Sequence, residues 1–150
     1  MVTTFNSCTS LTSVPLFDTS SVTLMNTMFN SCYSLTSVPL FNTSNVTNMS
    51  NMFRFCYSLT SVPAFDVSSV LSSGNIINIF NTCPSLSRIE ATGFNYTFSV
   101  ASCKLSSAAL DEIYTNLPTV TGQTITVSGN YGVSGDDPTI ATAKGWTVTG

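Results

Sequence analysis

The chain has 150 residues, enough for one domain with a continuous core, and 43% of them are hydrophobic, which excludes a disordered chain. Only 7% are charged and the formal net charge is −3, whereas an ordinary globular domain has roughly 25% charged residues. The four Lys and Arg residues form no basic patch, which excludes nucleic acid and an anionic membrane as partners.

Ser, Thr and Asn fill the polar positions, so we expect a neutral, hydroxyl-rich surface that suits a rigid external structure. The first residues, MVTTFNSCTS, contain neither a basic nor an apolar segment, and no signal peptide is predicted. The chain has no apolar run of roughly 18 residues or more, and no transmembrane helix is predicted.

Four units follow the pattern F-x-x-C-x-x-L-x-x-V-x-(apolar), with Ile in place of Val in the fourth. They begin at Phe5, Phe29, Phe53 and Phe80, with spacings of 24, 24 and 27 residues. The three extra residues of the last spacing fall around Ser72 to Ile76. A period in the twenties with this apolar frame is typical of a leucine-rich-repeat solenoid.

The first half of each unit predicts a short strand, because its apolar residues alternate and one face can be buried. The frames are Leu11, Val14 and Leu16; Leu35, Val38 and Leu40; Leu59, Val62 and Ala64; Leu86, Ile89 and Ala91. A proline interrupts three of them, at positions 15, 39 and 63. Proline cannot donate a ladder hydrogen bond, so these strands should be very short or interrupted there.

The second half of each unit predicts a short helix. In residues 43–53, Val46, Met49, Met52 and Phe53 recur at helical spacing, and Thr43 is a plausible N-cap. Residues 19–29 repeat this pattern one unit earlier. The many Ser, Thr and Asn residues give poor helix propensity, so stacking between units would have to hold these helices.

The phrase NTSNVTNMSNMFRFCYSLTSVP resembles the BspA-like leucine-rich repeat, the type also described from mycoplasma lipoproteins. The resemblance covers roughly residues 5–91 and includes two near-identical copies. It implies a right-handed parallel solenoid that is used for adhesion and protein contacts, without catalysis. The chain departs from the family by having Pro where many members have Asp in the strand.

Beyond residue 91 the repeat is less regular, and residues 92–102 read as a loop or irregular strand. Residues 105–117 predict a helix with Ser107 as its cap, ended by Pro118. Residues 124–127 predict a strand, residues 137–145 a compact helix between Asp137 and Gly145, and residues 146–148 a last strand. We expect these strands to extend the same sheet through Ile125, Val127, Trp146 and Val148.

The predicted fold is therefore an α/β solenoid, a right-handed leucine-rich-repeat-like stack of short parallel strands and short helices with about six turns. Residues 1–102 would form the repeat solenoid, and residues 103–150 the C-terminal helix–strand turns that cap it. This last segment also resembles the ends of phage tail and other virion proteins that carry such repeats.

The chain has no histidine, which removes the usual general base, the Ser–His and Cys–His pairs and most zinc sites. Four cysteines repeat with the units, at positions 8, 32, 56 and 83, so they should stack at one interior position. Disulfides between neighbouring turns or a bound metal remain alternatives, and Cys103 falls outside the period and could be free. We predict no enzyme, no cofactor and no metal.

The acidic residues also favour structural roles. Asp137 fits a helix cap better than half of a calcium pair with Asp136. Asp18, Asn42 and Asp66 occupy equivalent positions in successive units, as expected of turn residues.

Two surfaces are candidate interaction sites. The first, here called the hydroxyl strip, is the outward face of the strands, for which plain solvation is the alternative reading. It comprises Thr12, Ser13, Thr36, Ser37, Thr60, Ser61, Ser87, Arg88 and Glu90. The second, the N-terminal edge, is the uncovered face of the first unit. It comprises Phe5, Cys8, Leu11 and Val14.

These features lead to two functional hypotheses. The first is a non-enzymatic phage virion protein, a decoration, fibre or tail-associated component that is assembled in the host cytoplasm and contacts other virion proteins or copies of itself. The alternative is a bacterial cell-surface adhesion module that binds a host protein or glycan. Neither hypothesis involves nucleic acid or a membrane as partner.

Overall fold

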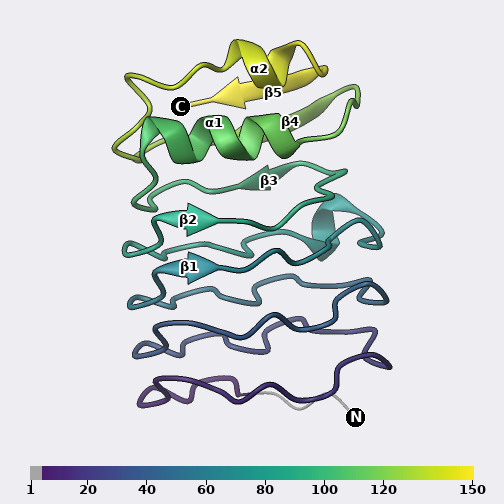
Figure 1. Ribbon diagram of the computed structural model, residues 1–150, viewed down its shortest axis with the longest axis vertical. Coiled ribbons are helices and arrows are strands. Elements are labelled where there is room, and N and C mark those ends of the chain that lie inside the picture. Colours follow the sequence, from purple (N-terminus) through teal and green to yellow (C-terminus); the bar gives the residue numbers. More distant parts are fainter. Residues whose placement is uncertain (1–4) are drawn as a thin grey trace.

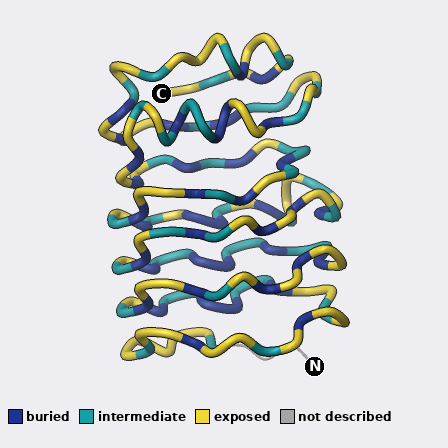
Figure 2. The backbone as a smooth tube through the Cα atoms, in the orientation of Figure 1, coloured by how far each residue is buried: buried dark blue, intermediate teal, exposed yellow. Residues whose placement is uncertain are grey.

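The computed structural model describes residues 5–150. Successive turns of the backbone lie one upon another along the long axis, with the two chain ends at opposite ends of this stack (Figure 1). Buried segments recur in turn after turn, whereas the turn nearest the N-terminus is mostly exposed (Figure 2). The core is therefore a column that runs through the stack.

Within residues 5–150 the strand pairings are parallel and join residues about one unit apart. β1 (Ser61–Val62) pairs with β2 (Arg88–Ile89). A second sheet contains β3 (Phe98–Ser99), β4 (Gln123–Thr126) and β5 (Trp146–Thr149) in that order. Isolated parallel bridges join Leu24 to Asn48 and Asp66 to Thr92. The leucine-rich-repeat class of the stack, its hand and its number of turns stay predictions.

The strands in the repeat units are short, as predicted, because β1 ends at the residue before Pro63. The prediction that the last apolar residue of each frame is buried is wrong for the first three units and holds for Ala91 in the fourth. Leu16 is 68% exposed and Leu40 57% exposed, and Ala64 is exposed too. In the third unit the Phe65 N–H donates to the Pro63 carbonyl at 2.6 Å, a tight turn that directs residue 64 outward.

The predicted helices at residues 19–29 and 43–53 are wrong: both segments are hydrogen-bonded turns. Among the described residues, eight non-glycine residues have φ between 56° and 62°. Thr27 and Ser31 are two of them, and Asn51 and Phe55 are their equivalents one unit later. A left-handed residue cannot continue a right-handed helix, and its cost of roughly 1–2 kcal/mol must be offset by other contacts.

A ladder of backbone hydrogen bonds between turns supplies those contacts. The N–H groups of Met25, Thr27, Phe29 and Ser31 donate to the carbonyls of residues 48, 50, 52 and 54 at 2.8–2.9 Å. The intervening N–H groups of residues 28 and 30 bond within their own turn, three residues back. Alternate donors therefore point along the stack, an arrangement that a helix does not allow.

Phenylalanine rings fill the centre of the stack. Phe5, Phe29, Phe53 and Phe80 form one near-parallel column, with centroids 5.6, 5.6 and 6.2 Å apart. Phe17, Phe41 and Phe65 form a second column beside it. The repeat thus places each ring on its counterpart in the next unit, and the contacts of these rings replace those of a broad hydrophobic sheet.

The three-residue insertion and the C-terminal region contain the helices. η1 (Ser73–Asn75) is a 3-10 turn within the inserted segment. α1 (Ser107–Asn116) has Ser106, not the predicted Ser107, as its cap, since the Ser106 side chain accepts from the Ala109 N–H. α2 (Thr139–Thr142) is shorter than predicted. The prediction of one continuous sheet is also wrong, because β3, β4 and β5 form a sheet separate from that of β1 and β2.

Lys144 links the two C-terminal helical segments. Its ammonium group donates to the carbonyls of Tyr114, Thr115 and Leu117, at 3.2, 2.5 and 2.9 Å. The last carbonyls of a helix lack partners within the helix and carry partial negative charge. Lys144 therefore caps α1 from the following turn.

We expect Phe53→Ala to lower the free energy of unfolding by roughly 3–5 kcal/mol, because Phe53 is fully buried and stacks on both sides. Phe5→Ala is the matched control at the end of the same column, where the ring stacks on Phe29 and is partly exposed. It should cost about half of that or less. Chemical denaturation of both variants measures the difference, and equal losses would contradict the column as the source of stability.

Candidate interaction surfaces and the cysteine column

The periodic cysteines form a buried column that hydrogen-bonds from turn to turn. The Sγ of Cys32 lies 3.1 Å from the Phe5 carbonyl oxygen, and that of Cys56 lies 3.1 Å from the Phe29 carbonyl oxygen. Cys83 repeats the contact with Phe53 at 3.0 Å. The predicted interior stack is confirmed for these three residues, whereas Cys8 is exposed.

The column continues beyond the repeat that the sequence revealed. Cys103, predicted to lie outside the period, is buried, and its Sγ lies 3.9 Å from the Phe80 carbonyl oxygen. One turn later Asn130 takes the same position: its side-chain N–H donates to the Val100 carbonyl at 2.8 Å, and its side-chain oxygen accepts from the Leu105 N–H. In the sequence, each of these two positions follows an apolar residue by three, as each earlier cysteine follows a phenylalanine. Here the apolar residue is Val100 before Cys103 and Val127 before Asn130.

Burial governs the acidity of these thiols. Removal from water raises the pKa of Cys32 to about 11 and that of Cys83 to about 12. The pKa values of Cys56 and Cys103 are raised further, again mainly by burial and then by the neighbouring cysteines. The column therefore holds neutral thiols, which are poor nucleophiles and poor metal ligands. All five cysteines are free, so the disulfide alternative has no support.

The hydroxyl strip lies on the outer face, with seven of its residues exposed and Ser61 and Glu90 half-buried. Part of it is structural. The Thr36 hydroxyl donates to the Thr12 carbonyl at 3.1 Å, Thr60 donates likewise to Thr36, and Ser87 to Thr60. The hydroxyl protons of Thr36, Thr60 and Ser87 are therefore used between turns.

The neighbouring positions of the strip differ. In the described part of the chain, the hydroxyls of Ser13, Ser37 and Ser61 take part in no hydrogen bond. At the far end, Arg88 pairs with Glu90 at 2.9 Å and with Glu112 at 3.6 Å, so its charge is locally balanced. The strip can thus offer neutral donors and acceptors in a regular row.

The N-terminal edge is less exposed than predicted. Cys8 is exposed, Phe5 and Leu11 are half-buried, and Val14 is buried at 9% exposure. Their counterparts in the next unit, Phe29, Cys32 and Leu35, are 0% exposed. The edge is thus an incompletely covered face, with Val14 already part of the core.

Apolar side chains also reach the surface near this edge. Leu16 and Leu40 line an open hollow of about 650 Å³ together with Asp18 and Asn42. Tyr33 and Tyr57 stack at 4.9 Å and are 40% and 41% exposed. These groups can contribute contact area without charge.

The acidic residues have structural partners. The side chains of Asp18, Asn42 and Asp66 each accept the backbone N–H two residues later, which confirms their turn role. Hydrogen bonds from the Ser20 side chain and then from the Ser20 N–H lower the pKa of Asp18. Asp137 accepts from the Thr139 N–H at 3.0 Å, but the N-cap of α2 is Pro138, one residue after the predicted Asp137.

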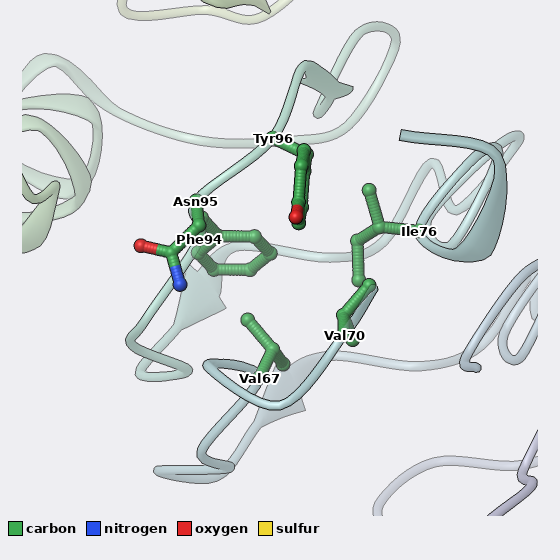
Figure 3. A pocket seen from close by; sticks show the side chains of 6 residues that line it. All are labelled: Val67, Val70, Ile76, Phe94, Asn95 and Tyr96. Carbon is green, nitrogen blue, oxygen red and sulfur yellow. The ribbon is translucent and has the colours of Figure 1, made fainter. Parts of the chain in front are cut away.

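A small apolar cavity lies near the three-residue insertion. The cavity in Figure 3 lies between Val67, Val70, Ile76, Phe94 and Tyr96, and it has no room for a water molecule. Residues 5–150 contain no cluster of three or more cysteines and carboxylates placed to hold a metal ion. Within the same range no helix is both long and apolar enough to span a bilayer.

These features define a repeat protein whose turns are joined through a buried column and whose distinctive chemistry lies on its outer surface. The family model described as "Mycoplasma protein of unknown function, DUF285" matches residues 1–102, and the chain belongs to this family. It is a Mycoplasma repeat family related to BspA-like surface repeats, in keeping with the resemblance seen in the sequence. No curated protein and no solved structure matches the chain.

The cysteine column predicts a sharp difference in thiol reactivity. Under native conditions Cys8 should react with a thiol reagent at the rate of a free exposed cysteine, because it lies outside the buried column. Cys32 and Cys56 should react only when the chain unfolds. Mass spectrometry of the labelled peptides measures this, and rapid labelling of Cys56 in the folded chain would rule out the column.

The raised thiol pKa values also predict a loss of stability at high pH. Below pH 9 the thiols are neutral in the folded and unfolded chain, and their full contribution is present. As the pH rises from 9 through about 11, unfolded cysteines ionise while Cys32 in the folded chain does not, so stability falls. Tyr114, whose pKa is also raised by burial, adds to the decline from about pH 10.

Chemical denaturation at a series of pH values measures this decline. A variant with alanine at positions 32, 56 and 83 is the control, and its stability should fall less steeply between pH 9 and 11. A decline of equal steepness in both chains would contradict the assignment to the thiols.

Proposed function

We propose that the chain is a non-enzymatic structural protein of a phage virion, a right-handed leucine-rich-repeat-type solenoid that serves as a decoration, fibre or tail-associated component. The observation that carries the proposal is the incompletely covered N-terminal edge. There, Phe5, Cys8 and Leu11 occupy positions that are fully buried one unit later. Such an edge is suited to contact with another virion protein or another copy of the chain.

The chemistry of this edge favours a protein partner. The Phe5 ring stacks on Phe29 on one side, and Cys8 lies at a column position whose counterparts donate to a carbonyl of the preceding turn. A partner that packs an apolar group on the free side of Phe5 and offers a backbone carbonyl to Cys8 would reproduce the contacts made between successive turns. Leu16 and Leu40 add apolar surface beside it.

The composition fits the same role. A face with few charges and fixed hydroxyls loses little side-chain entropy on docking, because Thr36 and Thr60 are already held between turns. The sequence resemblance of residues 103–150 to the ends of virion proteins supports this context, and the family match ends at residue 102.

Membership of this family supports a second candidate function, that of a cell-surface adhesion module. Its relation to BspA-like surface repeats favours a bacterial cell-surface adhesion module, in which the hydroxyl strip and the exposed Tyr33–Tyr57 pair would contact a host protein or glycan. A virion protein would be found on phage particles and an adhesion module on the bacterial cell surface, so the location of the chain distinguishes the two functions.

Mass spectrometry of purified phage particles from the host that encodes the chain tests the proposal. We expect the wild-type chain in stoichiometric copy number, reduced incorporation of Cys8→Arg, which adds charge at the N-terminal edge, and normal incorporation of Leu71→Arg. Leu71 is 65% exposed, so its replacement is a matched surface control. Absence from particles together with exposure on intact cells would replace this function by the adhesion module.

A further inference from the structure

The ladder between turns is interrupted at one junction. Four N–H groups bridge the second and third units, and four more bridge the third and fourth, from Met49, Asn51, Phe53 and Phe55. At the next junction the corresponding donors are Asn78, Phe80 and Thr82, and within the described residues their N–H groups make no hydrogen bond. The ladder resumes one turn later, where Val100 and Ser102 donate to residues 126 and 128.

Chain length explains this junction, here called the seam. The spacing from Phe80 to Val100 is 20 residues, four fewer than the usual 24, so β3 crosses the stack in extended form. The segment below it, residues 76–82, is a compact turn with Asn78 and Thr82 in the left-handed region. On one side of an extended strand, hydrogen-bonding groups recur about every 6.6 Å. The N–H groups of a compact turn are spaced differently, so the two segments cannot form a regular ladder.

A groove of about 790 Å³ lies along the seam. Ser73, Gly74 and Ile77 line one side, and Thr97, Phe98 and Ser99 line the other. η1, the small coil drawn in teal in Figure 1, lies beside the stack at this level, below β3. None of the lining residues is charged, and Ile77 is 51% exposed.

The strand β3 presents a free edge to this groove. Its other edge is occupied by β4, to which Val100 donates at 2.9 Å. Successive backbone groups of a strand point to opposite sides, so the N–H and C=O of Ser99 point away from β4. Neither group has a hydrogen bond within residues 5–150.

We propose that the seam is a binding site for a short, extended, uncharged peptide segment of a partner protein, which adds as a strand to the free edge of β3. The unpaired backbone groups of Ser99 supply the hydrogen bonds of strand addition, and the exposed Ile77 side chain supplies contact for one small apolar side chain. The neutral lining disfavours a charged segment. This site shares no residue with the hydroxyl strip or the N-terminal edge and does not depend on the proposed function.

The probe is the acetylated and amidated peptide QTITVS, which has the sequence of residues 123–128 and therefore contains the strand that already pairs with the other edge of β3. In NMR spectra of the isotope-labelled full chain, the peptide should shift the amide signals of Ile77 and Ser99. Hydrogen exchange of the Ser99 amide should slow by roughly tenfold or more. A peptide N-methylated at alternate residues should do neither.

Ile77→Lys should weaken peptide binding by roughly tenfold or more, since it places a charge in the groove without touching the backbone. Leu71→Lys is the control, because Leu71 is an exposed apolar residue outside the groove (65% exposed, against 51% for Ile77), and this variant should bind as the wild type does. Thermal unfolding of both variants should match the wild type. Full protection of the Ser99 amide without peptide, or equal binding of the N-methylated peptide, would overturn the proposal.

Self-association is measured in parallel by sedimentation. A dimer that Ile77→Lys dissociates would make a second copy of the chain the occupant and would also overturn the proposal as stated. A monomer that binds the peptide through the groove supports it.

Discussion

The backbone carbonyl at the phenylalanine position is the group on which the stack depends. The Phe29 oxygen accepts the Cys32 N–H at 3.1 Å from its own turn and the Cys56 thiol at 3.1 Å from the next. Phe53 repeats this arrangement with Cys56 and Cys83. Each of these two oxygens therefore accepts two hydrogen bonds inside the core, one from its own turn and one from the next. A thiol suits the position, since it is small, costs little to bury and still donates a weak hydrogen bond.

This arrangement explains the unusual composition. The turns are joined mainly through backbone groups and stacked rings, so the outer side chains are free to be Ser, Thr and Asn. Left-handed residues such as Thr27 and Asn51 are tolerated because each lies in a segment that is hydrogen-bonded from both neighbouring turns. Because the stabilising contacts repeat along one axis, few charged pairs are needed. The stability of each unit then depends mainly on its contacts with the neighbouring units.

Repetition made much of this arrangement predictable. Residues at equal phase must lie on one another in a stack, which places Phe29 on Phe53 and Cys32 near Cys56 without any knowledge of conformation. The backbone conformation of each turn is less predictable from the sequence. Val46, Met49 and Met52 have helical spacing, yet turns that alternate donors along the stack bury the same residues. The period of apolar residues identifies which side chains are inside and leaves open how the backbone brings them there.

The candidate surfaces follow from departures from repetition, which is why the sequence revealed them unequally. Phe5 and Cys8 are found in the sequence because they match the repeat pattern, whereas the seam depends on the spacing between Phe80 and Val100, and Val100 does not match the phenylalanine of the pattern. Asn130 is hidden for the same reason, although it replaces a thiol in the column with a stronger donor and an additional acceptor. That exchange occurs beyond residue 102, near β4 and β5, which together with β3 replace compact turns by extended strands. The buried column of cysteine and asparagine side chains therefore continues where compact turns give way to extended strands. The ladder of backbone hydrogen bonds between turns, in contrast, is interrupted at the seam, where the two kinds of backbone meet.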